Sequence, residues 1–165
     1  MVKKLLFLMV VLFGTMVSAQ TIAPPCKEVP ALNKQILETL KPYIGKKIGR
    51  GECWDAAELA LNTVKADWDG VYAYGRVIDI KKECIQPGDI LQMENVELEV
   101  VTEEGGYSES FPHHTAIVYS VKPNGELELI HQNTGQFGQK MGVTPFNLAH
   151  KTKGTLTFYR PVAKK

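Results

Sequence analysis

The hydrophobic periodicity of the chain changes once, and this change constrains the fold more than any other feature. Apolar residues recur at helical spacing over 31–40 and again from Cys53 to Val64. Beyond residue 70 the pattern becomes one of short β-rich runs separated by turn residues. Helices followed by a series of antiparallel strands predict an α+β fold in which the helices pack on the sheet.

The β-rich part of the chain is expected to form several short strands. Gly105-Gly106 and Asn124-Gly125 are the predicted hairpin turns, and residues 135–142 form a glycine-rich loop. The expected strands are 71–80, 90–93, 96–102, 107–111, 114–121, 126–131 and 155–159.

The first 19 residues are predicted to be a signal peptide. Lys3 and Lys4 precede an apolar run over 5–14, and the small residues 17–19 supply a cleavage site. The run is short for a membrane span, so a retained anchor is the weaker alternative. Residues 20–30, with three prolines, are expected to be extended, and 31–165 to form one domain. We therefore expect a secreted or periplasmic protein without a membrane segment after cleavage.

The overall charge excludes one class of partner. The 165 residues carry a net charge of +1 and no basic stripe, so no nucleic-acid partner is expected. We expect the protein to be a monomer.

Three cysteines, Cys26, Cys53 and Cys84, enter a compartment in which disulfides persist, if the chain is exported. The odd number leaves one thiol free. A Cys26–Cys84 bridge is the most economical pairing because it spares Cys53. The other two pairings, and no disulfide at all, remain open.

Cys53 is the strongest candidate for a reactive side chain in this sequence. It follows a glycine-bearing loop and opens the second predicted helix, where unpaired N–H groups and the helix dipole favour a thiolate. A cysteine on an apolar helical stripe is also commonly an inert core residue. The helix alone does not decide between nucleophile and packing.

Strand alternation supplies partners for this cysteine. If residues 122–125 form a hairpin loop, Ala116 faces His131 and His114 faces Asn133. His114, His131 and Asn133 then lie on one face of the sheet, and Gln132 points to the other.

These residue types match the needs of thiol catalysis. A thiol attacking an amide requires a base that later protonates the leaving amine, and imidazole is suited to that work. His131 or Asn133 would hold the imidazole of His114 in one tautomer. A metal site at His113, His114 and His131 is the weaker interpretation, because adjacent strand residues point to opposite faces. No metal or cofactor is expected.

Four short motifs together resemble a CHAP domain, the cysteine, histidine-dependent amidohydrolase/peptidase group related to NlpC-type peptidases of the papain-like fold. The resemblance covers roughly residues 34–160. Its motifs are Gly51-Glu52-Cys53-Trp54-Asp55, Pro87-Gly88-Asp89-Ile90-Leu91, His114-Thr115-Ala116-Ile117-Val118 and Ile130-His131-Gln132-Asn133.

By this resemblance Cys53 is the nucleophile, His114 the base and His131 the orienting residue, with Asn133 in reserve. The chain departs from the commoner CHAP pattern at His131, where glutamate is usual, and at Glu52, where glutamine is common. A carboxylate at position 52 would oppose thiolate formation unless it points into solvent. Tyr43 resembles a substrate-facing tyrosine of NlpC-type peptidases, but a core aromatic is the preferred interpretation.

The resemblance implies an exported thiol hydrolase that cleaves amide bonds, with peptidoglycan peptides as the default substrate. One alternative is a catalytically silent papain-like binding module. Another is an amidase or transferase acting on a different substrate.

Overall fold

The computed structural model describes residues 26, 28–102 and 105–164. Two α-helices come first and β-strands follow, which confirms the predicted α+β fold. The helices are α1 (Ala31–Leu40) and α2 (Cys53–Thr63), with short 3-10 helices at η1 (Lys41–Tyr43) and η2 (Leu148–His150). The strands are β1 (Ala66–Asp67), β2 (Arg76–Val77), β3 (Ile90–Thr102), β4 (Gly105–Val121), β5 (Leu127–His131), β6 (Gly142–Phe146), β7 (Lys151–Arg160) and β8 (Val162–Ala163).

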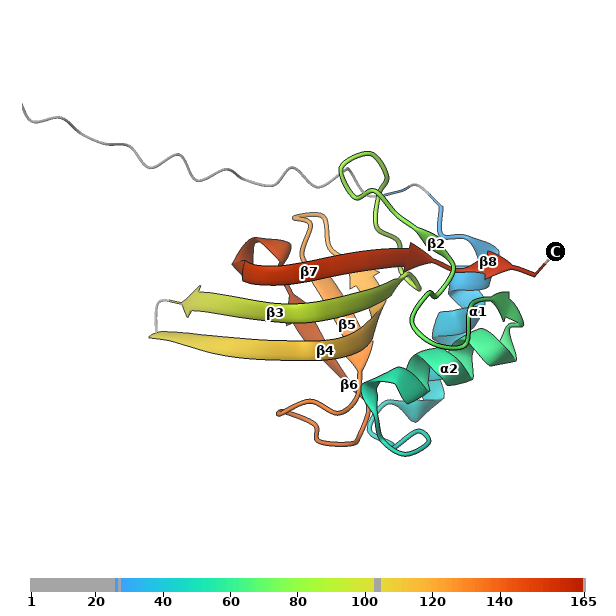
Figure 1. Ribbon diagram of the computed structural model, residues 1–165, viewed down its shortest axis with the longest axis horizontal. Coiled ribbons are helices and arrows are strands. Elements are labelled where there is room, and N and C mark those ends of the chain that lie inside the picture. The colour runs from blue at the N-terminus through green and yellow to red at the C-terminus, as the bar shows by residue number, and fades with distance from the viewer. Residues whose placement is uncertain (1–25, 27, 103–104, 165) are drawn as a thin grey trace, which may run out of the picture.

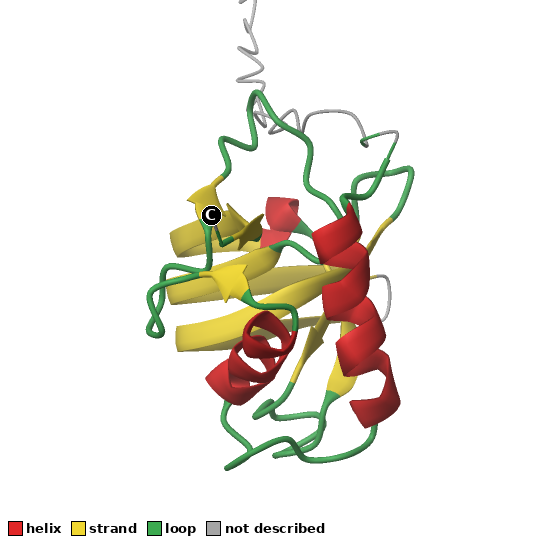
Figure 2. Ribbon diagram, turned by 90° about the vertical axis from the view of Figure 1, so that its right-hand side faces the viewer, coloured by secondary structure: helices red, strands yellow, loops and turns green. Residues whose placement is uncertain are grey.

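Six strands form one antiparallel sheet in the order β2-β7-β3-β4-β5-β6, while β1 and β8 form a separate pair (Figure 1). The helices α1 and α2 contact each other, and α2 contacts β4. Figure 2 shows both helices gathered on one side of the strands. The sheet therefore has one face covered by helices, as predicted.

The strands differ from the expected ones in length and number. The predicted strands 90–93 and 96–102 are one continuous strand, β3. Likewise, the predicted strands 107–111 and 114–121 are both parts of β4. Gly105 and Gly106 belong to β4, so the turn prediction was wrong; the connection, residues 103–104, lies outside the described residues. Only two residues of the expected strand 71–80 form one, and β6 was not expected.

Apolar side chains form one cluster on each face of the sheet. On the helical face, Ala57, Ala60 and Leu61 of α2 are fully buried with Ile117 and Ile130 of the sheet. The small alanines let the helix lie close to the strands. The other cluster lies behind the sheet and includes Leu91, Met93, Ala116, Val118, Leu129 and Phe158. Position 53 is thereby held at the end of a tightly packed helix.

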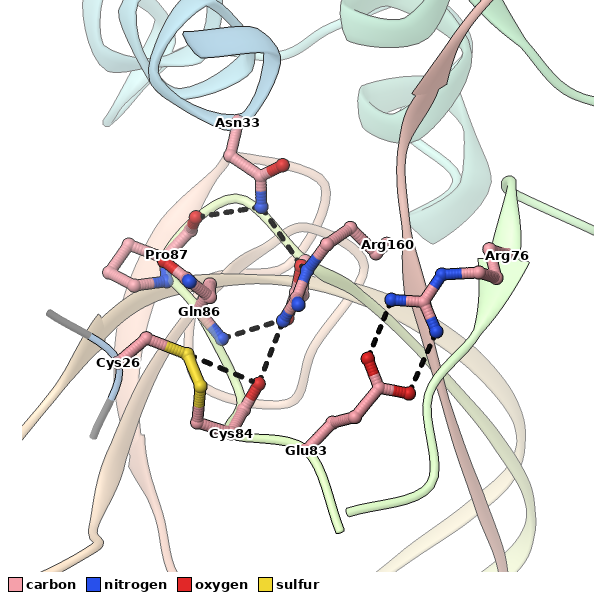
Figure 3. The surroundings of a disulfide bond; sticks show 9 residues. Cys26, Asn33, Arg76, Glu83, Cys84, Gln86, Pro87 and Arg160 are labelled. Atoms are coloured by element: carbon pink, nitrogen blue, oxygen red, sulfur yellow. Dashed lines mark hydrogen bonds and ion pairs between the residues drawn. A yellow bond between two sulfur atoms is a disulfide. The ribbon is translucent and has the colours of Figure 1, made fainter. Parts of the chain in front are cut away.

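A disulfide joins Cys26 to Cys84, the pairing that spares Cys53. Figure 3 shows its surroundings: Arg160 donates to the Cys84 carbonyl at 2.7 Å and pairs with the buried Asp89 carboxylate at 2.9 Å. Asn33 of α1 donates to the same carboxylate at 2.9 Å. The network links the N-terminal segment, α1 and β7.

No helix in the described part of the chain has the length and apolarity needed to cross a membrane. The predicted signal peptide, residues 1–19, lies outside the described residues.

Candidate active site

The β4–β5 hairpin brings the two predicted histidines into contact. Val121 pairs with Leu127, so the loop is one residue longer than predicted, but an irregularity between Val118 and Ser120 restores the predicted register at Ile117 and Ile130. As a result the ring nitrogens His114 Nε2 and His131 Nδ1 lie 2.9 Å apart. Both histidines are buried, with 4% and 3% of their surface exposed.

Thr144 of β6 extends this contact into a chain of three residues. Its Oγ1 lies 2.9 Å from His131 Nε2. For His114 to act as a base through Nδ1, its hydrogen must sit on Nε2 and be donated to His131 Nδ1. His131 then carries its own hydrogen on Nε2 and donates it to Thr144. This assignment satisfies all three groups and leaves His114 Nδ1 as the basic nitrogen. The reverse assignment, in which Thr144 donates to His131 and His131 to His114, satisfies the same contacts.

Burial keeps both imidazoles neutral. It lowers the pKa of His114 from 6.5 to about 4, with a smaller contribution from the charge of His113. It also lowers the pKa of His131 from 6.5 to about 3, with a smaller contribution from His114. Desolvation disfavours the charged form, and two imidazoles in contact cannot both be protonated without repulsion. Near neutral pH the pair is therefore an uncharged base and an uncharged acceptor.

Cys53 lies half-buried at the first position of α2. Burial raises the pKa of its thiol, and the charge of Glu52 adds to that effect. Backbone N–H groups of Thr115 and Trp54 oppose it by stabilising the thiolate. Because Thr115 follows His114 in β4, this interaction places the sulfur beside the strand that carries the base.

The loop before Cys53 is fixed by a buried carboxylate in the first turn of α2. Asp55 Oδ2 accepts hydrogen bonds from the backbone N–H groups of Arg50, Gly51 and Glu52 at 2.7, 3.0 and 3.1 Å. Its other oxygen pairs with the Arg50 guanidinium at 2.9 Å. Asp55 therefore satisfies the loop amides that precede the nucleophile position.

A cavity of about 650 Å³ opens beside Cys53, and His114 lines it too. No hydrogen bond joins the Cys53 sulfur to His114 among the described residues, so the two groups share a cavity without being bonded. A second cavity of about 220 Å³ adjoins the first and reaches His131 and Thr144.

Asn133 and Glu52 form a pair of their own at the mouth of the first cavity. Asn133 Nδ2 donates to Glu52 Oε2 at 2.9 Å. The expectation that Asn133 converges on His114 assumed that β5 continues to residue 133, but β5 ends at His131 and Asn133 has a left-handed φ of 62°. His131, not Asn133, contacts His114. The Glu52 carboxylate is exposed and accepts a hydrogen bond from this amide.

Tyr43 neither lines the cavities near Cys53 nor belongs to the core. It belongs to η1, is 36% exposed, and is absent from the linings of both cavities. The core interpretation was wrong because the helical stripe of α1 ends at Leu40, and η1 has no buried residue.

Gln132 is the functional residue that sequence reasoning missed. It is completely buried, and its amide makes three hydrogen bonds to the backbone of the loop before Cys53. Oε1 accepts from Ile48 N at 3.1 Å, while Nε2 donates to Ile48 O at 3.0 Å and to Glu52 O at 2.7 Å. Alternation predicted that it points to the face opposite His131, but gave no sign that this face would bind the loop before Cys53.

Within the described residues, no three His, Cys, Asp or Glu side chains gather as metal ligands. His113 lines the larger cavity, pairs with Glu94 at 3.1 Å, and has its ring centroid 4.4 Å from that of Tyr72.

A cysteine opening a helix that packs on an antiparallel sheet, with a histidine on the adjacent strand, defines the papain-like cysteine proteinase class. The family model described as the AIM3/BBC1 cysteine proteinase-fold domain matches residues 31–165. The chain belongs to that family. This supports the papain-like part of the predicted resemblance, while the finer CHAP assignment stays a prediction.

One solved structure shares the fold. It is described as the crystal structure of Ly7917 with the hydrolyzing product of MDP, and it is 15% identical to this chain with a TM-score of 0.51. The match covers 78% of this chain and 62% of that one, so the chain spans about three fifths of its length. No curated protein matches the chain.

Proposed function

We propose that this protein is a thiol hydrolase that cleaves amide bonds through an acyl-enzyme on Cys53. The observation that carries the proposal is the chain His114–His131–Thr144, because its contacts allow the tautomer in which His114 Nδ1 is basic, and His114 lines the same cavity as Cys53.

The proposed reaction has two steps. His114 Nδ1 accepts the thiol proton as the Cys53 sulfur attacks the amide carbonyl; the carbon–nitrogen bond then breaks, and His114 donates the proton to the leaving amine. Water next attacks the thioester, with His114 as base, and releases the carboxylic acid and the free thiol. The N–H of Cys53 at the helix start is a donor to the oxyanion. His131 accepts from the imidazolium and stabilises it.

The depressed pKa of His114 selects general-base catalysis over a resting thiolate–imidazolium pair. Both groups are neutral before substrate binds, since burial raises the pKa of the thiol and lowers that of the imidazole. The proton therefore moves during attack.

The proposed substrates are peptidoglycan peptides. We also propose that the protein is secreted or periplasmic and is released by cleavage after residue 19. The support is the CHAP-like motif order, the predicted signal peptide and the similar structure, whose title names a hydrolyzing product. The fold by itself does not fix a substrate.

A zymogram on purified cell wall tests this assignment, with Cys53→Ala and Asn62→Ala proteins beside the wild type. Asn62 is exposed at the far end of α2 and serves as the matched control. We expect clearing by the wild type and by Asn62→Ala only. Equal behaviour of the wild type and Cys53→Ala would sink the peptidoglycan assignment. Acylation of Cys53 without clearing would point to an amidase or transferase with another substrate.

A catalytically silent binding module is the second candidate. It is favoured by the raised thiol pKa and by the missing hydrogen bond between Cys53 and His114. It predicts tight substrate binding that is the same in wild type and Cys53→Ala, with no covalent intermediate detectable by mass spectrometry.

A further inference from the structure

Among the strands of the described residues, none covers a long stretch of one backbone edge of β4. It pairs with β3 from Gly105 to Ile117, whereas β5 pairs only with the residues from Ile117 to Val121. Between residues 106 and 116 the second edge of β4 therefore has no strand partner in the described part of the chain. In Figure 1 the far ends of β3 and β4 project to the left, away from the helices. Such an edge is a template for another extended chain.

This edge begins at the proposed nucleophile. The backbone N–H of Thr115 interacts with the Cys53 sulfur, so it points to the uncovered side of β4. The backbone carbonyl groups of an extended peptide bound along the same edge would lie near the Cys53 sulfur. Residues 108–111 of β4 continue that line away from Cys53.

The strand register identifies which amides face outward in this part of β4. Thr152 Oγ1 donates to the carbonyl of Glu97, so the backbone groups of Glu97 face β7. Its β4 partner is Ser110, which therefore directs its own N–H and C=O away from β3. By alternation Ser108 does the same, while Glu109 bonds to β3.

The uncovered edge forms one wall of a groove. Ser110 and Phe111 line both the 650 Å³ and the 220 Å³ cavity, as do Thr134 and Gly135, which follow β5. The two cavities thus adjoin along β4, with Cys53 in the larger one.

The smaller cavity carries an uncompensated negative charge. Glu109 lines it, is exposed, and has no ion pair among the described residues. By contrast, Glu97 pairs with Lys153 at 2.8 Å. A cationic side chain is the complement that this position lacks.

We propose that the uncovered edge of β4 at Ser108 and Ser110 binds an extended peptide as an added strand, with a cationic side chain of that peptide against Glu109. The inference deepens the proposed function, because it assigns the substrate class of the same site. Main-chain pairing supplies affinity, and the side-chain contact supplies selectivity.

Amide exchange in the ¹⁵N-labelled mature Cys53→Ala protein tests the proposal, since it needs binding but no catalysis. The probe is an acetylated, amidated peptide of six alternating alanine and lysine residues. We expect exchange of the Ser108 and Ser110 amides to slow at least tenfold on saturation, and the Glu109 amide, already bonded to β3, to stay unchanged. The same peptide with N-methylated alanines should bind at least tenfold more weakly, because it cannot pair.

Glu109→Gln should weaken lysine-peptide binding about fivefold, in line with one exposed ion pair, while the exposed Glu99→Gln, outside both cavities, should not. The proposal is overturned by no binding at millimolar peptide, by equal binding of the N-methylated peptide, or by equal effects of the two substitutions. A protein that binds as expected but never forms an acyl-enzyme would leave this inference standing and defeat the proposed function instead.

Discussion

At the scale of single residues, the defining feature of this protein is a pair of neutral, buried histidines next to a half-buried cysteine. A thiolate–imidazolium pair needs a high histidine pKa and a low cysteine pKa. Burial does the reverse here, because it lowers the pKa of His114 and raises that of Cys53. Thr144 closes the hydrogen-bond chain behind them. Under the proposed function, the proton therefore moves during attack rather than before it.

The histidine pair makes stability depend on pH. The folded pKa values, about 4 and about 3, lie below the usual 6.5, so the unfolded chain binds more protons between these values. The free energy of unfolding should fall as pH decreases from about 6.5 to 4, by up to about 3 kcal/mol for each histidine. Urea unfolding at several pH values measures this loss. In His114→Gln the slope should be roughly halved, and an unchanged slope would show that other groups cause it.

Orientation by His131 is separable from folding by conservative substitution. His131→Asn keeps an amide that can accept from His114 Nε2, whereas His131→Ala leaves that hydrogen unpaired. We expect kcat to fall roughly tenfold in the first variant and about 100-fold or more in the second, with KM nearly constant. Equal losses in both variants, following their loss of stability, would reduce His131 to a structural role.

At the scale of elements, the sequence predicted the helices well and the strands in fragments. Asn95 and Pro112 interrupt the apolar pattern, so β3 and β4 were each expected as two pieces. In the structure these two residues lie opposite each other, and the register stays the same on both sides. The buried side of β3 changes phase there, from Leu91 and Met93 to Val96 and Leu98.

The unpredicted β6 shows a second limit of pattern reasoning. Gly142 and Pro145 are unfavourable in strand interiors, but β6 is an edge strand with only β5 as its neighbour. Edge strands tolerate proline. Because Thr144 lies on β6, the third member of the histidine chain was out of reach of the sequence, although His114 and His131 were found by alternation.

The end of β5 positions both the histidine pair, through His131, and the loop before Cys53, through Gln132. The second role is testable by substituting Gln132. Gln132→Ala removes three hydrogen bonds and leaves the Ile48 and Glu52 backbone groups unpaired in the interior. We expect a loss of about 2–3 kcal/mol in unfolding free energy. Urea denaturation checks it, with the exposed Gln35→Ala of α1 as control. A loss below about 0.5 kcal/mol would mean that the loop before Cys53 is held by Asp55 alone.

At the scale of the whole molecule, one covalent link and one buried ion pair fasten the N-terminal segment to the sheet. The Cys26–Cys84 disulfide was one of several pairings that the sequence allowed, since no local pattern relates cysteines 58 positions apart. Arg160 at the end of β7 connects this link to Asp89. The segment before α1 is thereby tied to the end of β7.

Removing the disulfide should destabilise the protein without touching the site. For Cys26→Ser with Cys84→Ser, the chain-entropy relation gives a loss of about 4 kcal/mol, reduced by any structure left in the unfolded chain. Thermal unfolding of the double variant and the wild type measures it. The rate of Cys53 acylation in the folded double variant should stay within about twofold of wild type. A large drop in that rate would link the disulfide to catalysis.

The central claim is that Cys53 is a nucleophile served by His114, and the pH dependence of its acylation by p-nitrophenyl acetate tests it most directly. In the wild type the rate should rise through a pKa of about 4, level off, and rise again only when the thiol itself ionises. Mass spectrometry should place the acetyl group on Cys53. In His114→Gln the level region should vanish, leaving only the thiol's own rise. Superimposable profiles for the two proteins would contradict the claim.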